Sequence, residues 1–142
     1  MYYGIFLNDA FSSNERNLIF TSKNKAENNP QYATNGGYDT YDEVFLLSVS
    51  EADYYFRDNG ARMCPVTDYA LKQGAKTKPA YSVNGVSTAW WWLRTPGHSC
   101  RRAVFVDRGG DIWNGDPGGI YGEYVDSKEI VVRPAIWINI SD

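Results

Sequence analysis

The segment AWWWLRTPG, residues 89–97, decides the fold. Three consecutive tryptophans on an extended strand must alternate between its two faces, so Trp91 faces opposite to Trp90 and Trp92. We predict a strand over residues 89–94, ended by the turn-forming residues 95–97. We expect all three tryptophans to pack inside the protein. The alternative is that one face forms a stacking platform for a sugar or for a partner's side chain.

Apolar runs separated by turn residues indicate the remaining strands. Residues 103–106 and 111–113, joined by a turn at 107–110, predict a hairpin. Residues 44–47 and 131–140 are strongly apolar and predict two further strands. Residues 22–43, 75–88 and the glycine-rich stretch 115–122 predict loops, because turn formers are frequent there and the apolar periodicity stops.

Two short helices are expected in the first half of the chain. Ser48 and Ser50 each precede an acidic residue by three positions, and either pair can form a capping box that opens a helix over residues 51–56. Thr67 predicts the N-cap of a second helix over residues 67–73. The first thirty-odd residues also predict a helix in a polar frame, with N-cap chemistry at residues 12–15 and a short apolar-containing turn at 16–20. The predicted class is α+β: a single domain over residues 1–142 with two short helices, small antiparallel sheets and long irregular loops.

Composition limits the classes of function. The chain has 142 residues, enough for one domain that buries about two-thirds of its unfolded surface. A net charge of −3 without a long basic stripe argues against a nucleic-acid partner. No run approaches the ~20 apolar residues of a membrane span, and the first residues lack the features of a signal peptide. An aromatic content of 15% indicates β-structure and adhesive surfaces.

The sequence offers little for catalysis or metal binding. His98 is the single histidine, and its neighbours Ser99 and Cys100 lie in no Gly-x-Ser-x-Gly motif. Cys64 and Cys100 allow at most one disulfide and no zinc set. The acidic residues after position 100 lack the spacing of a calcium loop. We therefore expect no enzymatic activity, no cofactor and no metal. Arg94 and Arg133 each lie next to a strand-edge proline, and we expect both guanidinium groups to satisfy structural carbonyls or a carboxylate.

Residues 98–127 are the candidate recognition surface. They are rich in Gly, Asp, Tyr, Ser and Arg, and lie between two strongly apolar segments. Aromatic anchors, arginines for bidentate contacts and small adaptable residues are typical of a displayed binding surface. We expect Trp113, Tyr121, Tyr124 and the arginines to be its anchors. The alternative is a merely solvated loop region.

Several strings resemble, in order, the bacterial and phage family known as domain of unknown function 6273. They are FLNDAFSSNER (6–16), TNGGYDTYDEVFLLS (34–48), VFLLSVSEADYYF (44–56), NGARMCPVTDYALKQGA (59–75), WWWLRTPG (90–97), AVFVDRGGDI (103–112) and VVRPAIWIN (131–139). The resemblance implies a C-type lectin fold, with more sequence expected before residue 6. It also implies similarity to the variable proteins of diversity-generating retroelements, in which adenine mutagenesis yields a restricted set of residues at chosen surface positions.

Mutated adenines do not produce Lys, Glu, Gln, Met or Trp, and none of these occurs from His98 to Ile112. Over residues 98–127 only Trp113 and Glu123 depart from this pattern. The resemblance implies that Ala103, Val106, Gly110 and Ile112 are fixed scaffold. The ligand-contacting, diversified positions would be His98, Ser99, Cys100, Arg101, Arg102, Phe105, Asp107, Arg108, Asp111, Trp113, Asn114, Asp116, Tyr121, Tyr124 and Asp126.

The function expected from the resemblance is a non-catalytic binding or adhesion module for a protein or glycan, on a bacterial surface or phage particle and as part of a larger protein. Two alternatives use the same fold. A formylglycine-generating oxidase would need Cys64 and Cys100 as a copper-binding pair. A calcium-dependent lectin would need Glu-Pro-Asn or Gln-Pro-Asp, and Trp113-Asn114-Gly115-Asp116 is only a faint echo of its second motif.

Overall fold

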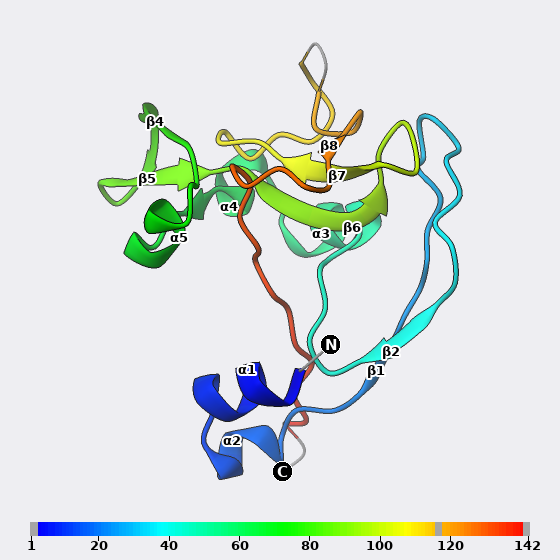
Figure 1. Ribbon diagram of the computed structural model, residues 1–142, viewed down its shortest axis with the longest axis vertical. Helices are drawn as coiled ribbons and strands as arrows, with labels where there is room; N and C mark the ends of the chain where they lie inside the picture. The colour runs from blue at the N-terminus through cyan, green and yellow to red at the C-terminus, as the bar shows by residue number, and fades with distance from the viewer. Residues whose placement is uncertain (1–2, 116–117, 141–142) are drawn as a thin grey trace.

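The computed structural model describes residues 3–115 and 118–140. Within them the chain forms five short helices and three small antiparallel sheets, an α+β architecture (Figure 1). The helices are α1 Tyr3–Ala10, α2 Ser13–Arg16, α3 Val49–Tyr55, α4 Asn59–Arg62 and α5 Asp68–Lys72. The strands are β1 Ser22–Asn24, β2 Thr40–Asp42, β3 Cys64–Pro65, β4 Thr77–Val83, β5 Val86–Ala89, β6 Trp91–Pro96, β7 Arg102–Val106 and β8 Glu123–Tyr124.

The tryptophan segment forms β6, as predicted, in the sheet β6-β7-β8. Trp91 pairs with Val106 and Trp92 with Phe105 across the antiparallel ladder. The other side of Trp91 forms a parallel bridge to Val131. The faces of the strand alternate as expected, since Trp91 lies in one buried cluster and Trp92 in another.

The larger cluster fills the space between α3 and the β6-β7-β8 sheet, which we call the main sheet. It contains Val49, Ala52, Trp91, Leu93, Val104, Val106, Ile112 and Ile120. Fully burying one such aliphatic side chain contributes about 1.5–3 kcal/mol, so this cluster is the main source of stability. The indole N–H of Trp91 is also satisfied, because it donates to the Arg62 carbonyl at 2.9 Å. On the opposite face Trp92, Phe105 and Ile130 form the second cluster, with Trp90 packed against it.

The predicted helix caps are confirmed. Ser48 is the N-cap of α3 and forms a reciprocal capping box with Glu51. Thr67 is the N-cap of α5, and Ser12 forms a capping box at the start of α2. The expectation of two helices was too low. α1 and α2 are two short helices within the first thirty-odd residues, which were expected to be helical. α4 was not expected; it begins at Asn59 because the Asp58 side chain accepts the N–H of Ala61.

Five strand and loop predictions were wrong. Residues 75–88, predicted as loop, hold most of the β4–β5 hairpin, and the segment 22–43 contains β1 and β2. Residues 111–113 do not pair with β7, whose second partner is β8. Residues 44–47 and 131–140 are extended but make only isolated bridges, because they bond at separate points instead of along one ladder: Ile19 to Ile138, Phe45 to Ala135 and Trp91 to Val131.

The two three-stranded sheets and α1–α2 lie at opposite ends of the molecule (Figure 1). The β1–β2 ribbon and the C-terminal segment run between them, and Ile138 bridges to Ile19, which follows α2. Among the described residues, no helix has the length and apolar character needed to cross a membrane.

Candidate functional site

The loop between β1 and β2 reaches the main sheet through one buried side chain. Asn29 is 1% exposed, and its amide group donates to the carbonyls of Pro96 (2.8 Å) and Ile120 (3.0 Å). Its side-chain oxygen accepts the backbone N–H groups of Gln31 and Tyr32, each at 2.9 Å. Asn29 thereby fixes Gln31 and Tyr32 beside the segment that follows β6.

Five side chains form a continuous group there, which we call the aromatic array: Tyr32, His98, Arg102, Tyr121 and Tyr124. The His98 and Tyr121 rings stack with centroids 4.5 Å apart and an interplanar angle of 15°. Tyr32 meets both rings edge-on, at 5.6 and 5.7 Å. The guanidinium carbon of Arg102 lies 5.0 Å from the centre of the Tyr121 ring and 3.9 Å from that of Tyr124. These contacts hold the rings in place before any ligand arrives.

Backbone contacts fix Arg102 as well. Its guanidinium donates to the Gly122 carbonyl at 2.9 Å and lies 3.4 Å from the Glu123 carboxylate. Gly97 and Gly122 allow this close approach, because a Cβ on Gly122 would lie 2.6 Å from the Ala103 carbonyl oxygen, and one on Gly97 would lie 2.6 Å from the Tyr121 carbonyl oxygen. The turn after β6 is thus packed tightly onto the segment before β8.

A cavity of about 430 Å³ opens beside the array. We call it the Trp113 pocket, and it is lined by Gln31, Tyr32, Trp113, Gly115, Gly118, Ile120 and Tyr121. The indole N–H of Trp113 donates to the Asp53 carboxylate at 3.0 Å, which ties the ring to α3. The volume of the Trp113 pocket falls within the range of small-molecule binding sites, roughly 300–1,000 Å³.

The turn that carries Trp113 is held by two aspartates. The Asp107 carboxylate accepts the N–H groups of Gly109 (2.8 Å) and Asp111 (2.9 Å). The Asp111 carboxylate accepts the N–H of Trp113 at 2.8 Å and both the N–H and the side-chain amide of Asn114. Burial acts to raise the pKa of Asp111, but these hydrogen bonds outweigh it and hold the pKa below its ordinary value.

The predicted site residues separate into two groups. The first is at least partly open to solvent and lies in the array, at the Trp113 pocket or on the adjoining turns: His98, Ser99, Cys100, Arg101, Arg102, Trp113, Asn114, Tyr121, Tyr124 and Asp126. The second supports the fold. Phe105 is 5% exposed and stacks on Trp90 at 4.5 Å, so its prediction as a displayed residue was wrong.

Asp107, Arg108 and Asp111 are half-buried and belong to the supporting group through their contacts. Arg108 lies over the Trp90 ring at 4.7 Å and donates to the Lys76 carbonyl. Asp116 lies outside the described residues. The predicted scaffold residues Val106, Gly110 and Ile112 are buried, and Ala103 is half-buried.

Sequence reasoning missed Gln31 and Tyr32. Both lie in a segment that was predicted only as loop, and Asn29, which places them, bonds to groups 67 and 91 residues away. No local pattern reveals such a contact. Asn29-Pro30 marked a turn, but it gave no sign of what the turn packs against.

The comparison with protein families agrees with this layout of motifs. The model of the family described as Domain of unknown function (DUF6273) matches residues 4–140. The chain belongs to the DUF6273 family. No curated protein and no solved structure matches it.

The two cysteines of this DUF6273 domain are free. Cys64 lies in β3, where burial raises the pKa of its thiol and the nearby charge of Arg133 opposes that effect only in part. Cys100 is exposed in the turn after β6. Within residues 3–115 and 118–140, no group of three or more His, Cys, Asp or Glu side chains is placed to hold a metal ion.

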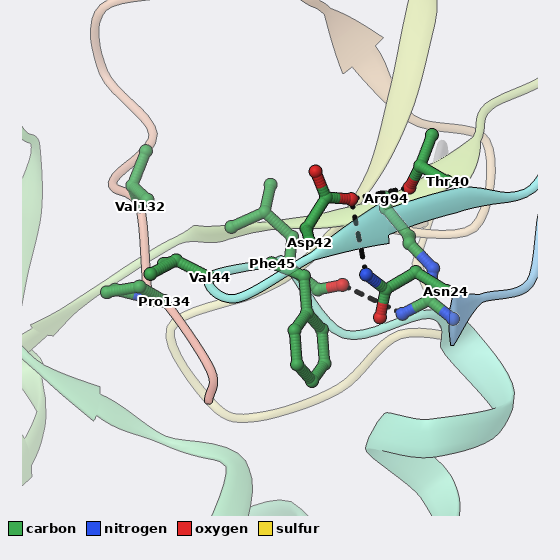
Figure 2. Close-up of a pocket in the computed structure, with 9 residues that line it drawn as sticks. Asn24, Thr40, Asp42, Val44, Phe45, Arg94, Val132 and Pro134 are labelled. Carbon is green, nitrogen blue, oxygen red and sulfur yellow. Dashed lines mark hydrogen bonds between the residues drawn. The ribbon is translucent and has the colours of Figure 1, made fainter. Parts of the chain in front are cut away.

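A second cavity, of about 440 Å³, lies between β1–β2 and the C-terminal segment (Figure 2). Phe45, Val44, Val132 and Pro134 give it apolar walls. Its polar groups already bond to one another, since Asp42 accepts from Thr40 (2.6 Å) and from Asn24 (3.2 Å).

Arg94, at the edge of the second cavity, is equally committed to the fold. Its guanidinium bonds to both carboxylate oxygens of Glu51 and to the carbonyls of Lys25 and Leu46. Its predicted structural role is confirmed. Arg133 likewise donates to the Arg62 carbonyl and lies over the rings of Phe56 and Trp91, as a structural residue should.

Proposed function

We propose that this DUF6273 domain is a non-catalytic binding domain that presents the aromatic array and the adjoining Trp113 pocket to a protein or glycan ligand. One observation carries the proposal: five side chains from three separate segments are fixed against one another at a partly exposed surface. Aromatic and arginine side chains dominate binding energies at interfaces. Because these side chains are already ordered, ligand binding has a smaller cost in side-chain entropy.

We further propose that the fold is of the C-type lectin kind and that the surface is diversified by a retroelement. The solvent-open positions 98–102, 121, 124 and 126 suit such a role, because they lie on a support of fully buried residues that includes Val104, Val106 and Ile112. The set of diversified positions that we propose is smaller than the set expected from the sequence. Phe105, Asp107 and Asp111 support the surface by packing or by backbone hydrogen bonds, and we remove them from the diversified set.

A retention experiment tests the proposed function. The domain is immobilised and exposed to solubilised bacterial envelope proteins and to a glycan panel, with Arg101→Glu and Tyr124→Ala as surface variants. Tyr69→Ala is the matched control, since Tyr69 is 73% exposed on α5. We expect a defined partner to be retained by wild type and control and lost by both surface variants. Retention of the same species by all four proteins would show that the array is not the binding surface.

The coding sequence provides an independent test of diversification. A nearby reverse transcriptase gene is expected, together with a near-copy of the segment encoding residues 98–140 that differs only at adenines. Differences at codons for residues 98–102, 121, 124 and 126 would support the narrower set. Differences concentrated at Phe105, Asp107 or Asp111 would contradict it.

A further inference from the structure

The Trp113 pocket has a lining whose chemistry points to one class of ligand. It is lined by the aromatic residues Tyr32, Trp113 and Tyr121, by Gln31, and by Gly115, Gly118 and Ile120. Every lining residue within the described part of the chain is uncharged. Among these described lining residues, an ionic ligand would lose hydration without meeting a compensating charge, which is costly.

The polar groups of the pocket remain available to a ligand. The Gln31 amide N–H₂ donates to the Tyr32 hydroxyl at 3.1 Å, and among the described residues its carbonyl oxygen has no hydrogen-bond partner. Within the same residues the Tyr121 hydroxyl also has none, and the Tyr32 hydroxyl keeps its own proton to donate. The pocket therefore combines aromatic faces with neutral donors and acceptors of both kinds.

Its rings are held before a ligand binds. Tyr121 is stacked on His98, and Tyr32 is edge-on to both. The Trp113 indole is tied to Asp53 and its backbone to Asp111. A ligand that matches these positions needs little side-chain ordering.

We propose that the Trp113 pocket binds one sugar unit of a neutral glycan, without a metal ion. A pyranose ring has an apolar face of C–H groups that packs on aromatic rings, and hydroxyl groups that both donate and accept. The cavity of about 430 Å³ holds a monosaccharide or a disaccharide. This inference rests on the proposed binding function and assigns the ligand class of that same surface.

Saturation-transfer NMR and calorimetry in the presence of EDTA test the inference on the intact domain. The probes are the methyl glycosides of glucose, galactose, mannose and N-acetylglucosamine, with cellobiose and lactose; glucuronic acid and N-acetylneuraminic acid are the charged comparison. Trp113→Ala removes a wall, and Gln31→Ala removes an exposed polar group without disturbing the core. Tyr69→Ala, far from the pocket on α5, is the control.

We expect at least one neutral probe to bind at millimolar concentration with EDTA present. Trp113→Ala should weaken it at least tenfold, which corresponds to about 1.4 kcal/mol, and Gln31→Ala severalfold, while Tyr69→Ala leaves it unchanged. The inference is overturned if no neutral probe binds, if only the charged sugars bind, or if both pocket variants bind like wild type. The wild-type domain could instead bind none of the sugars and yet retain a protein partner through Arg101 and Tyr124. That result would overturn this inference alone and leave the proposed function standing.

Discussion

Replacing Tyr121 by alanine tests the aromatic array, because the Tyr121 ring contacts three of its other members. It stacks on His98 at 4.5 Å, meets Tyr32 edge-on at 5.7 Å and lies under Arg102 at 5.0 Å. An aromatic pair contributes about 0.5–1.5 kcal/mol beyond its burial. A cation over a partly exposed ring contributes about 0.5–1 kcal/mol. We therefore expect Tyr121→Ala to lower the free energy of unfolding by about 2–3 kcal/mol.

Urea unfolding followed by circular dichroism measures that loss. Tyr121→Phe is the matched control, because it keeps the ring and all three contacts. We expect its free energy of unfolding to stay within about 0.5 kcal/mol of wild type. Equal midpoints for wild type and Tyr121→Ala would show that the ring contributes nothing, and that the array is not fixed in advance.

A double-mutant cycle isolates the stacked pair. His98→Ala and Tyr121→Ala are made singly and together, and the coupling free energy should be about 0.5–1.5 kcal/mol in favour of the pair. Additive losses would mean that the stacking contributes no stability. In that case the two rings would be independent surface residues, and the array would lose its main physical support.

Three further predictions concern the support of the site. Arg94→Ala should lower the free energy of unfolding, measured by urea unfolding, by about 2–3 kcal/mol, because it leaves the Glu51 carboxylate without its partner. The loss should be somewhat smaller than for a fully buried ion pair. Arg94→Lys should recover only part of it. Burial acts to raise the pKa of Glu51, but the Arg94 and Ser48 hydrogen bonds hold it below its ordinary value. Its contribution is therefore complete above about pH 4.3 and lost as the pH falls through the lower folded-state pKa. Thermal melting from pH 6 to pH 3 should show wild type losing more stability than Glu51→Gln, and equal slopes would contradict the prediction. Gly110→Ala should prevent correct packing of the 107–110 turn, since the residue has φ +83° and its Cβ would lie 1.7 Å from the Asn59 carbonyl oxygen; a melting temperature equal to wild type would refute this.

The features that were predictable from the sequence are those fixed by neighbours along the chain. The alternation of Trp90, Trp91 and Trp92 follows from the period of two in any strand, and it holds in the structure. The caps at Ser48 and Thr67 were predictable for the same reason, because a capping side chain reaches only two or three residues ahead.

The β4–β5 hairpin was missed although its turn signal is present. Asn84 and Gly85 both have positive φ, which is the geometry that a two-residue hairpin turn requires. The interior of β4 is exposed at every position, so no apolar alternation marks it as a strand. The prediction for residues 131–140 was wrong in the opposite sense, because a strand was expected and none forms. They are apolar enough for a strand, but Val131, Ala135 and Ile138 each bridge to a different part of the chain.

The candidate site is the least predictable part, because its geometry depends on contacts between distant segments. Arg62 shows how its support is built. It is 7% exposed, and its guanidinium donates to the Gly110 carbonyl, to the Phe56 carbonyl and to the side chains of Asp53 and Asn59. It therefore joins α3 and α4 to the turn beneath Trp113. Nothing in the local sequence around Arg62 distinguishes it from an ordinary surface arginine.

The proposed diversification requires one segment to combine positions that change with positions that do not. Asp107 and Asp111 accept backbone N–H groups of their own turn, so a change at either one would unfold the loop that places Trp113. Arg101 and Cys100 project from a turn that closes through backbone groups, with the Arg102 N–H donating to the Ser99 carbonyl at 3.0 Å. Among the described residues, their side chains make no hydrogen bond that holds the turn. In the structure, side chains that hold the backbone and side chains that do not are neighbours within a single loop system.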